Sequence, residues 1–125
     1  MHSVDLTTIP VTATEFGDWA ALNGPLGLEA FGVNVVEPAL GSVSDFEHDE
    51  TDSSQQELYV VLSGRARFVI GGEVLEAGAG TAVGVGDPAL TRAYEALEVG
   101  TRVLCIGAAP SQAPEWGGWI GGSGA

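Results

Sequence analysis

The stretch "ELYVVLSGRARFVIGGEVLEAGAGTAVGV", residues 57–85, decides the fold class of this chain. Short runs of Val, Ile, Leu, Phe and Tyr alternate in it with glycines, which is the pattern of strands separated by tight turns. Within residues 65–70, Ala, Phe and Ile alternate with Arg, Arg and Val, as in a strand that buries one face. The glycines at 71 and 72 have the spacing of a two-residue hairpin. The stretch therefore predicts consecutive antiparallel strands.

The same rhythm extends to both sides of this stretch. Residues 31–37, 92–98 and 101–107 have strand patterns of similar length, and seven or more short strands are typical of a β-sandwich or β-barrel. We therefore expect an all-β fold. The exception is "TATEFGDWAAL", residues 12–22, where Thr12 and Glu15 have capping-box spacing and several apolar residues fall on one helical face. We expect one short N-terminal helix there.

The length of 125 residues, with 45% hydrophobic content, suits one ordinary domain. We divide it into an N-terminal segment, 1–29, that packs on the barrel, the barrel itself, 30–108, and a Gly/Trp-containing C-terminal tail, 109–125. Two tryptophans, Trp116 and Trp119, predict that this tail packs on the barrel or on a second subunit.

Charge and hydropathy exclude several classes of partner. Seventeen acidic side chains against four basic ones give a net charge of −13, which opposes binding to a phosphate backbone or an anionic membrane. No apolar run approaches the roughly 20 residues of a membrane span, and the first residues lack a basic and an apolar segment. We expect a cytoplasmic protein that binds neither nucleic acid nor membrane. The single cysteine, Cys105, sits in "RVLCIG" and is expected to be a small core residue.

The middle of the chain resembles the cupin family of small jelly-roll barrels. Glu57 is followed after six residues by Gly64, which matches the last part of the first family motif. His48 would fill the first histidine position of that motif, and Glu50 stands where the second histidine belongs. In the second motif, Thr91 occupies the position of the third histidine. The resemblance therefore comes with a depleted set of metal ligands.

This resemblance implies a cupin-type jelly-roll β-barrel of two antiparallel sheets, often a homodimer. In metal-bearing members the cavity holds one divalent ion on three histidines and a glutamate. Here His48, Glu50 and Glu57 are the candidate metal ligands. One imidazole and two carboxylates would hold iron, manganese, zinc or nickel only weakly. The cofactor is thus either none or one weakly held divalent ion, and the alternative for the acidic run 45–52 is a solvated loop.

The strand that begins at Glu57 allows a prediction of which side chains face the barrel cavity. With a period of two, Glu57, Tyr59 and Val61 share one face. If Glu57 faces the cavity, so does Tyr59, and a buried carboxylate must find a metal, an arginine or hydrogen-bond donors. Arg92 is one candidate donor, although we expect the four arginines as a group to face solvent. The candidate ligand-binding residues are Glu57, Tyr59, Phe68, Thr91 and Arg92.

These patterns leave three functions open. The first is a small cupin-domain protein that binds a small organic molecule in its barrel, with a degenerate or weak metal site. The second is a mononuclear divalent-metal enzyme of dioxygenase or isomerase type that uses His48, Glu50 and Glu57. The third is a metal-free epimerase or lyase in which His48 and Tyr59 act as base and acid.

Overall fold

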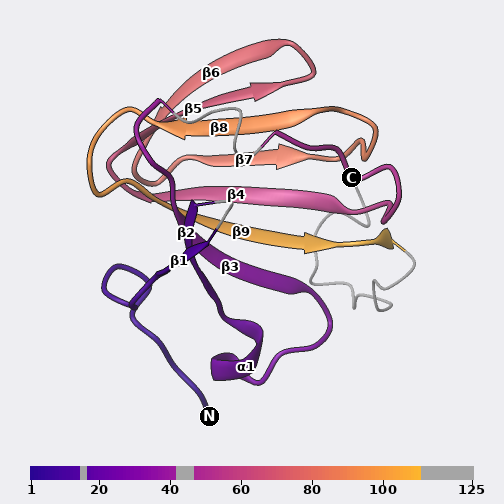
Figure 1. Ribbon diagram of the computed structural model, residues 1–125. Coiled ribbons are helices and arrows are strands. Elements are labelled where there is room, and N and C mark those ends of the chain that lie inside the picture. The colour runs from indigo at the N-terminus through magenta and orange to yellow at the C-terminus, as the bar shows by residue number, and fades with distance from the viewer. Residues whose placement is uncertain (15–16, 42–46, 111–125) are drawn as a thin grey trace.

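The structure is a computed structural model that describes residues 1–14, 17–41 and 47–110 (Figure 1). Within these ranges the chain forms nine strands and one short helix. In chain order they are β1 (Thr12–Thr14), β2 (Gly17–Ala21), α1 (Asn23–Leu26), β3 (Gly32–Glu37), β4 (Gln56–Ser63), β5 (Arg65–Ile70), β6 (Glu73–Gly78), β7 (Ala82–Val85), β8 (Arg92–Ala96) and β9 (Arg102–Ala108). In the described part of the chain, no helix is long and apolar enough to cross a membrane.

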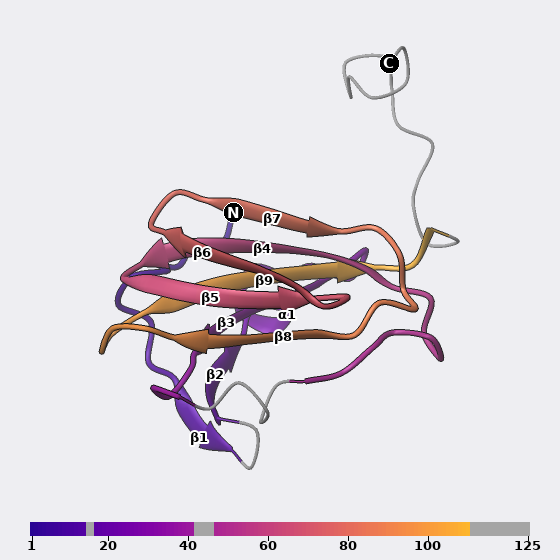
Figure 2. The same cartoon turned by 90° about the horizontal axis from the view of Figure 1, so that it is seen from above.

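The strands form two antiparallel sheets. The larger sheet has the order β1-β2-β3-β9-β4-β7, and the smaller has the order β6-β5-β8. Viewed from above, β5 and β8 run alongside β4 and β9 of the other sheet (Figure 2). Strands distant in the sequence are neighbours, since β9 pairs with both β3 and β4. This arrangement confirms the predicted all-β jelly roll.

Two glycine positions explain why the central stretch turns where it does. Gly71 and Gly72, with φ of 56° and 87°, form the tight turn between β5 and β6, as the hairpin spacing predicts. Gly64, with φ of 73°, separates β4 from β5, and a Cβ at this position would collide with Thr101. The intact end of the family motif is therefore a position that only glycine fits.

The short helix exists, but its predicted location at residues 12–22 is wrong. Residues 12–14 and 17–21 are strands β1 and β2, whereas α1 begins at Asn23. β2 pairs with the edge of β3, with Trp19 opposite Val36. Backbone pairing along an available sheet edge thus overrides a helical pattern that Gly17 weakens. Glu15 of the predicted capping box lies outside the described residues.

Two apolar clusters lie on the two faces of the larger sheet. The inner cluster is centred on Tyr59, Phe68 and Tyr94, whose ring centroids are 5.3 to 5.7 Å apart. The outer cluster is centred on Leu22, Val33 and Val35 and includes apolar residues of the N-terminal segment. Trp116 and Trp119 lie outside the described residues.

Arg102 is buried, contrary to the expectation that the four arginines face solvent, and it ties the N-terminal segment to the sheet. Arg102 donates hydrogen bonds to the carbonyls of Leu6 and Ile9, and its Nε donates to Glu37 at 3.2 Å. These bonds satisfy backbone carbonyls that the packed segment would otherwise leave without donors. The N-terminal segment is therefore held by polar as well as apolar contacts.

Candidate functional site

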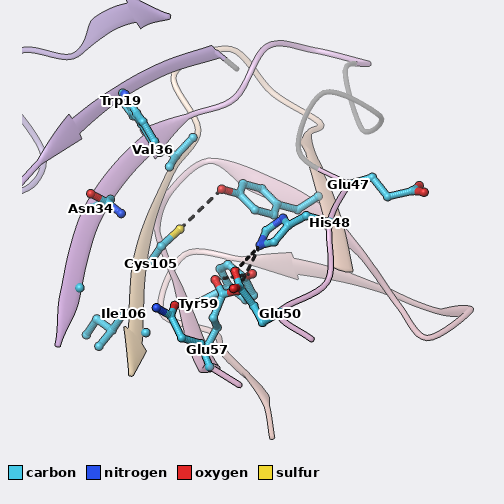
Figure 3. A pocket seen from close by; sticks show the side chains of 14 residues that line it. Trp19, Asn34, Val36, Glu47, His48, Glu50, Glu57, Tyr59, Cys105 and Ile106 are labelled. Carbon is cyan, nitrogen blue, oxygen red and sulfur yellow. Dashed lines mark hydrogen bonds and ion pairs between the residues drawn. The ribbon is translucent and has the colours of Figure 1, made fainter. Parts of the chain in front are cut away.

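A pocket of about 360 Å³ opens at one end of the inner face of the larger sheet. Strands β2, β3, β4, β8 and β9 supply its walls, and the segment that leads into β4 supplies its remaining side. One part of the lining is apolar and consists of Trp19, Val36, Tyr94, Cys105 and Ile106. The side chains of His48, Glu50 and Glu57 gather at another part, whereas the polar side chain of Asn34 lies on the same side as Trp19 and Val36 (Figure 3).

The polar end is a cluster of one histidine and two carboxylates. His48 Nε2 lies 3.0 Å from Glu50 Oε1 and 3.1 Å from Glu57 Oε1, and the three side chains point toward one another (Figure 3). Two backbone hydrogen bonds between His48 and Arg92 hold this segment against β8. The structure thus brings together all three residues proposed from the sequence as metal ligands.

Tyr59 lies on the same face of β4 as Glu57 and contacts the cluster through that carboxylate. Its hydroxyl donates to Glu57 Oε2 at 2.8 Å, and its side chain is buried. Burial raises the pKa of Tyr59 far above its usual value, and the neighbouring negative charge of Glu57 raises this pKa further. Tyr59 is therefore a neutral donor that holds Glu57 in place.

Glu57 is the centre of the hydrogen-bond network. Burial on its own would raise the pKa of this carboxyl, but the hydrogen bonds with His48, Tyr59 and Glu50, together with the charge of His48, outweigh burial and lower the pKa below its ordinary value. Glu57 is therefore ionised at neutral pH, although only 11% of its side chain is exposed.

Arg92 supplies a buried positive charge beside Glu57. The expectation that it faces solvent is wrong, because only 1% of its side chain is exposed. Its Nη1 donates to Glu57 Oε1 at 3.3 Å, and its other donors bind the carbonyls of Asp87, Pro88 and Leu90. In this inward orientation the guanidinium binds three carbonyls of the loop before β8, of which those of Asp87 and Pro88 also accept backbone amide hydrogen bonds.

The arginines of β5 behave as the sequence analysis expects. Arg67 is 39% exposed and forms ion pairs of 2.8 Å with Glu76 and Glu95 on the neighbouring strands. Arg65 is also exposed and lies 3.7 Å from Glu76. These side chains stabilise the outer face of the smaller sheet and do not reach the pocket.

Three of the five proposed ligand-binding residues do not line the pocket. Phe68 is buried in the inner apolar cluster, behind Tyr59 and Tyr94. Thr91, at the position of the third family histidine, is exposed. The guanidinium of Arg92 touches the cluster at Glu57 but is likewise not part of the lining. Of the proposed set, only Glu57 and Tyr59 line the pocket.

Several lining residues were not identified from the sequence as site residues. Trp19, Asn34, Gln55 and Tyr94 belong to this group. Among these residues, Asn34 could have been recognised from the sequence as a candidate site residue, because it is a polar residue among the valines of its strand. Cys105, expected in the core, is 8% exposed and also lines the pocket. Burial raises the pKa of its thiol to about 12, so it is protonated at neutral pH.

The chemistry of the donor set can be tested against the divalent ion that the fold suggests. A transition metal favours imidazole ligands, and the cluster offers one. Arg92, which cannot lose its proton, lies 3.3 Å from the Glu57 oxygen that would bind the ion, and a cation so close opposes a second one. The residues therefore do not fit a tightly held divalent metal ion.

Comparison with known proteins identifies the fold. No family model matches the chain, and no curated protein matches it. Solved structures do match. A cupin protein from Bacteroides fragilis shares 22% identity at a TM-score of 0.65, over 85% of this chain and 88% of that one. The structure of KdgF from Halomonas sp. has 15% sequence identity and a TM-score of 0.65, and the match covers 82% of this chain and 90% of that chain. The Cnp3 cupin domain of Schizosaccharomyces pombe has 12% sequence identity and a TM-score of 0.66, and the match covers 87% of this chain and 74% of that chain. The chain therefore has the cupin fold.

Proposed function

We propose that this protein binds a small organic molecule in the pocket between its sheets. The observation that carries the proposal is the pocket itself, whose volume of about 360 Å³ lies within the range of roughly 300 to 1,000 Å³ typical of small-molecule sites. Its lining combines an apolar wall with a few convergent polar groups, and that combination is usual for such sites.

The buried Arg92 supports a site that works without a metal ion. In a cupin barrel, a carboxylate at this depth needs a cation or several donors. Glu57 already has Arg92, His48 and Tyr59 as partners. The cluster is thus neutralised in part by the protein's own side chains, and its oxygens are oriented before any ligand arrives.

The experiment is a fragment screen on ¹⁵N-labelled protein with a chelator present throughout. We expect some fragments to shift the amide signals of Gly32 and Gly107 and the side-chain amide of Asn34, all of which line the pocket. Asn34→Tyr, which fills the pocket, should abolish these shifts, whereas Thr91→Tyr on the exposed loop should leave them intact. Binding that survives Asn34→Tyr, or a diverse library without a single pocket binder, would contradict the proposal.

A divalent-metal enzyme of dioxygenase or isomerase type is the second candidate. The observation that favours it is that single ligand atoms of His48, Glu50 and Glu57 lie within 4.8 Å of one another. Under this candidate, His48→Ala abolishes uptake of manganese or iron measured by equilibrium dialysis. Uptake that is unchanged in His48→Ala would remove it.

The metal-free epimerase or lyase with His48 and Tyr59 has less support. The hydroxyl proton of Tyr59 is donated to Glu57, and the raised pKa of Tyr59 makes it a weak acid. The hydroxyl is thus better suited to orienting Glu57 than to protonating a bound substrate.

A further inference from the structure

We infer that the ligand of this pocket is a flat, uncharged ring with an amide-type edge, meaning a carbonyl oxygen beside an N–H group, as in a carboxamide or a lactam. The inference rests on the proposed function, because it names the ligand class of the same pocket. Three features support it: a pair of facing glycines in the pocket wall, two side-chain amides beside them, and the pairing of the charged groups.

The first feature is a strip of backbone without side chains on the inner face of the larger sheet. Gly32 of β3 lies opposite Gly107 of β9 in the strand register, and both glycines line the pocket. A glycine inside a strand often marks a place where a ligand approaches the backbone closely. Because adjacent strands are about 4.8 Å apart, this glycine pair offers a surface on which a flat ring can lie. Val36 and Trp19 lie further along the same wall and offer apolar contacts to the rest of the ligand (Figure 3).

The second feature is a pair of neutral amide side chains that border the glycine pair. Asn34 follows Gly32 by two residues, so both face the pocket from β3. The carboxamide of Gln55 reaches over Gly107, since its Oε1 lies 2.9 Å from the position that a Cβ on Gly107 would occupy. Within the described ranges, neither carboxamide makes a hydrogen bond.

These two carboxamides determine the kind of edge that the pocket can recognise. Each carboxamide has a donor and an acceptor side by side. Such a side chain binds an edge with the complementary donor and acceptor, as asparagine binds the edge of adenine. A ligand edge that carries C=O beside N–H therefore matches both Asn34 and Gln55.

The third feature is that the charged groups of the pocket already have partners. Glu57 Oε1 lies 3.3 Å from Arg92 Nη1 and 3.1 Å from His48 Nε2, and Glu50 Oε1 lies 3.0 Å from the same imidazole nitrogen. An anionic ligand would approach the two carboxylates, and a cationic ligand would approach the guanidinium behind Glu57. An uncharged ligand meets neither repulsion, and this holds for both protonation states of His48.

The first test uses three flat probes of nearly the same shape and different charge: benzamide, benzoate and benzamidinium. Their affinities are measured by NMR titration at pH 7 with a chelator present. Benzoate has no donor and benzamidinium has no acceptor, so each loses at least one hydrogen bond to the carboxamides. We therefore expect benzamide to bind at least about five-fold more tightly than either ion. Cyclohexanecarboxamide, which carries the same amide on a thicker ring, should also bind more weakly than benzamide. The inference is overturned if any of these three probes binds as tightly as benzamide, or if benzamide causes no shifts at millimolar concentration.

A pair of glycine variants tests where the ring lies. Gly32→Ala adds a methyl group to the glycine pair, and the new Cβ would make only an ordinary contact of 3.6 Å with the carbonyl oxygen of Gly107. The fold should therefore tolerate this variant, whereas benzamide affinity should fall at least about ten-fold, because the methyl group occupies the surface of the ring. Gly84→Ala on β7 is the matched control, since Gly84 does not line this pocket and has open space for a Cβ. Equal effects of the two variants on benzamide affinity would overturn the inference.

Asn34→Leu tests the amide edge, because leucine has a similar size and no polar group. It should lower benzamide affinity about five-fold and should not lower the affinity for toluene, which has the same ring without the amide. An unchanged benzamide affinity would overturn the inference. If library fragments bind in the pocket without preference for flat amides, the ligand class is wrong and the proposed function stands; if a diverse library has no pocket binder, the proposed function itself fails.

Discussion

Replacing Arg92 with methionine tests whether the buried guanidinium neutralises Glu57. Arg92→Met keeps much of the side-chain volume but removes the positive charge and the donors to the carbonyls of Asp87, Pro88 and Leu90. Removing one partner of a buried ion pair costs about 3 to 5 kcal/mol. Because Glu57 keeps its hydrogen bonds with His48 and Tyr59, we expect the lower end, about 3 kcal/mol of unfolding free energy.

The assay is urea unfolding followed by circular dichroism, with Arg67→Met as the matched control. Arg67 is 39% exposed, and exposed ion pairs contribute about 1 kcal/mol or less. In a double-mutant cycle with Glu57→Gln, the double variant should be more stable than the summed losses imply, by about 1 to 2 kcal/mol, since removing Glu57 also removes the uncompensated charge. An Arg92→Met loss no larger than that of Arg67→Met, or strict additivity in the cycle, would refute the reasoning.

Three further predictions concern a turn, a thiol and a carboxylate. Gly64→Ala should destabilise the fold by about 2 kcal/mol or more, because of its positive φ and the collision with Thr101; Gly100→Ala, with φ of 80° and open space around it, should cost less in the same thermal melt. Cys105, whose thiol pKa is raised to about 12 by burial, should not react with a thiol reagent at pH 8 unless urea is present, and rapid reaction of the native protein would contradict its burial. The pKa of Glu57 in the folded protein is lowered from the ordinary value of 4.5, so the ionised carboxylate stabilises the fold above pH 4.5, and this stabilisation is lost as the pH falls through the lower folded pKa. The unfolding free energy of Glu57→Gln should therefore depend less on pH in this range. An unchanged pH profile would show that the carboxylate does not contribute to stability.

The strands from β4 onward could be predicted from the sequence because their signals are local. The alternation of exposed Arg65 and half-buried Arg67 with buried Ala66 and Phe68, and the paired glycines of the hairpin, depend only on neighbouring residues. The N-terminal strands were mistaken for a helix because their partner edge on β3 is distant in the sequence. Local periodicity carries no information about such an edge.

The polar end of the pocket was predicted from the sequence, whereas its apolar wall was not. Glu57 and Tyr59 share a strand face, and the resemblance to the first cupin motif assigned His48 and Glu50 to the same site although their spacings depart from that motif. The opposite wall comes from β2, β3 and β9, and its composition depends on how these strands pair. The orientation of Arg92 depends on carbonyls of a loop whose path the sequence does not specify.

The central claim is that the protein's own side chains, Arg92 above all, balance the carboxylates of the pocket, so that no divalent metal ion is held tightly there. Elemental analysis of protein purified without a histidine tag tests this claim most directly. We predict that iron, manganese, nickel and zinc are each present at far less than one atom per chain. Near-stoichiometric content of any one of them, lost in His48→Ala, would contradict the account.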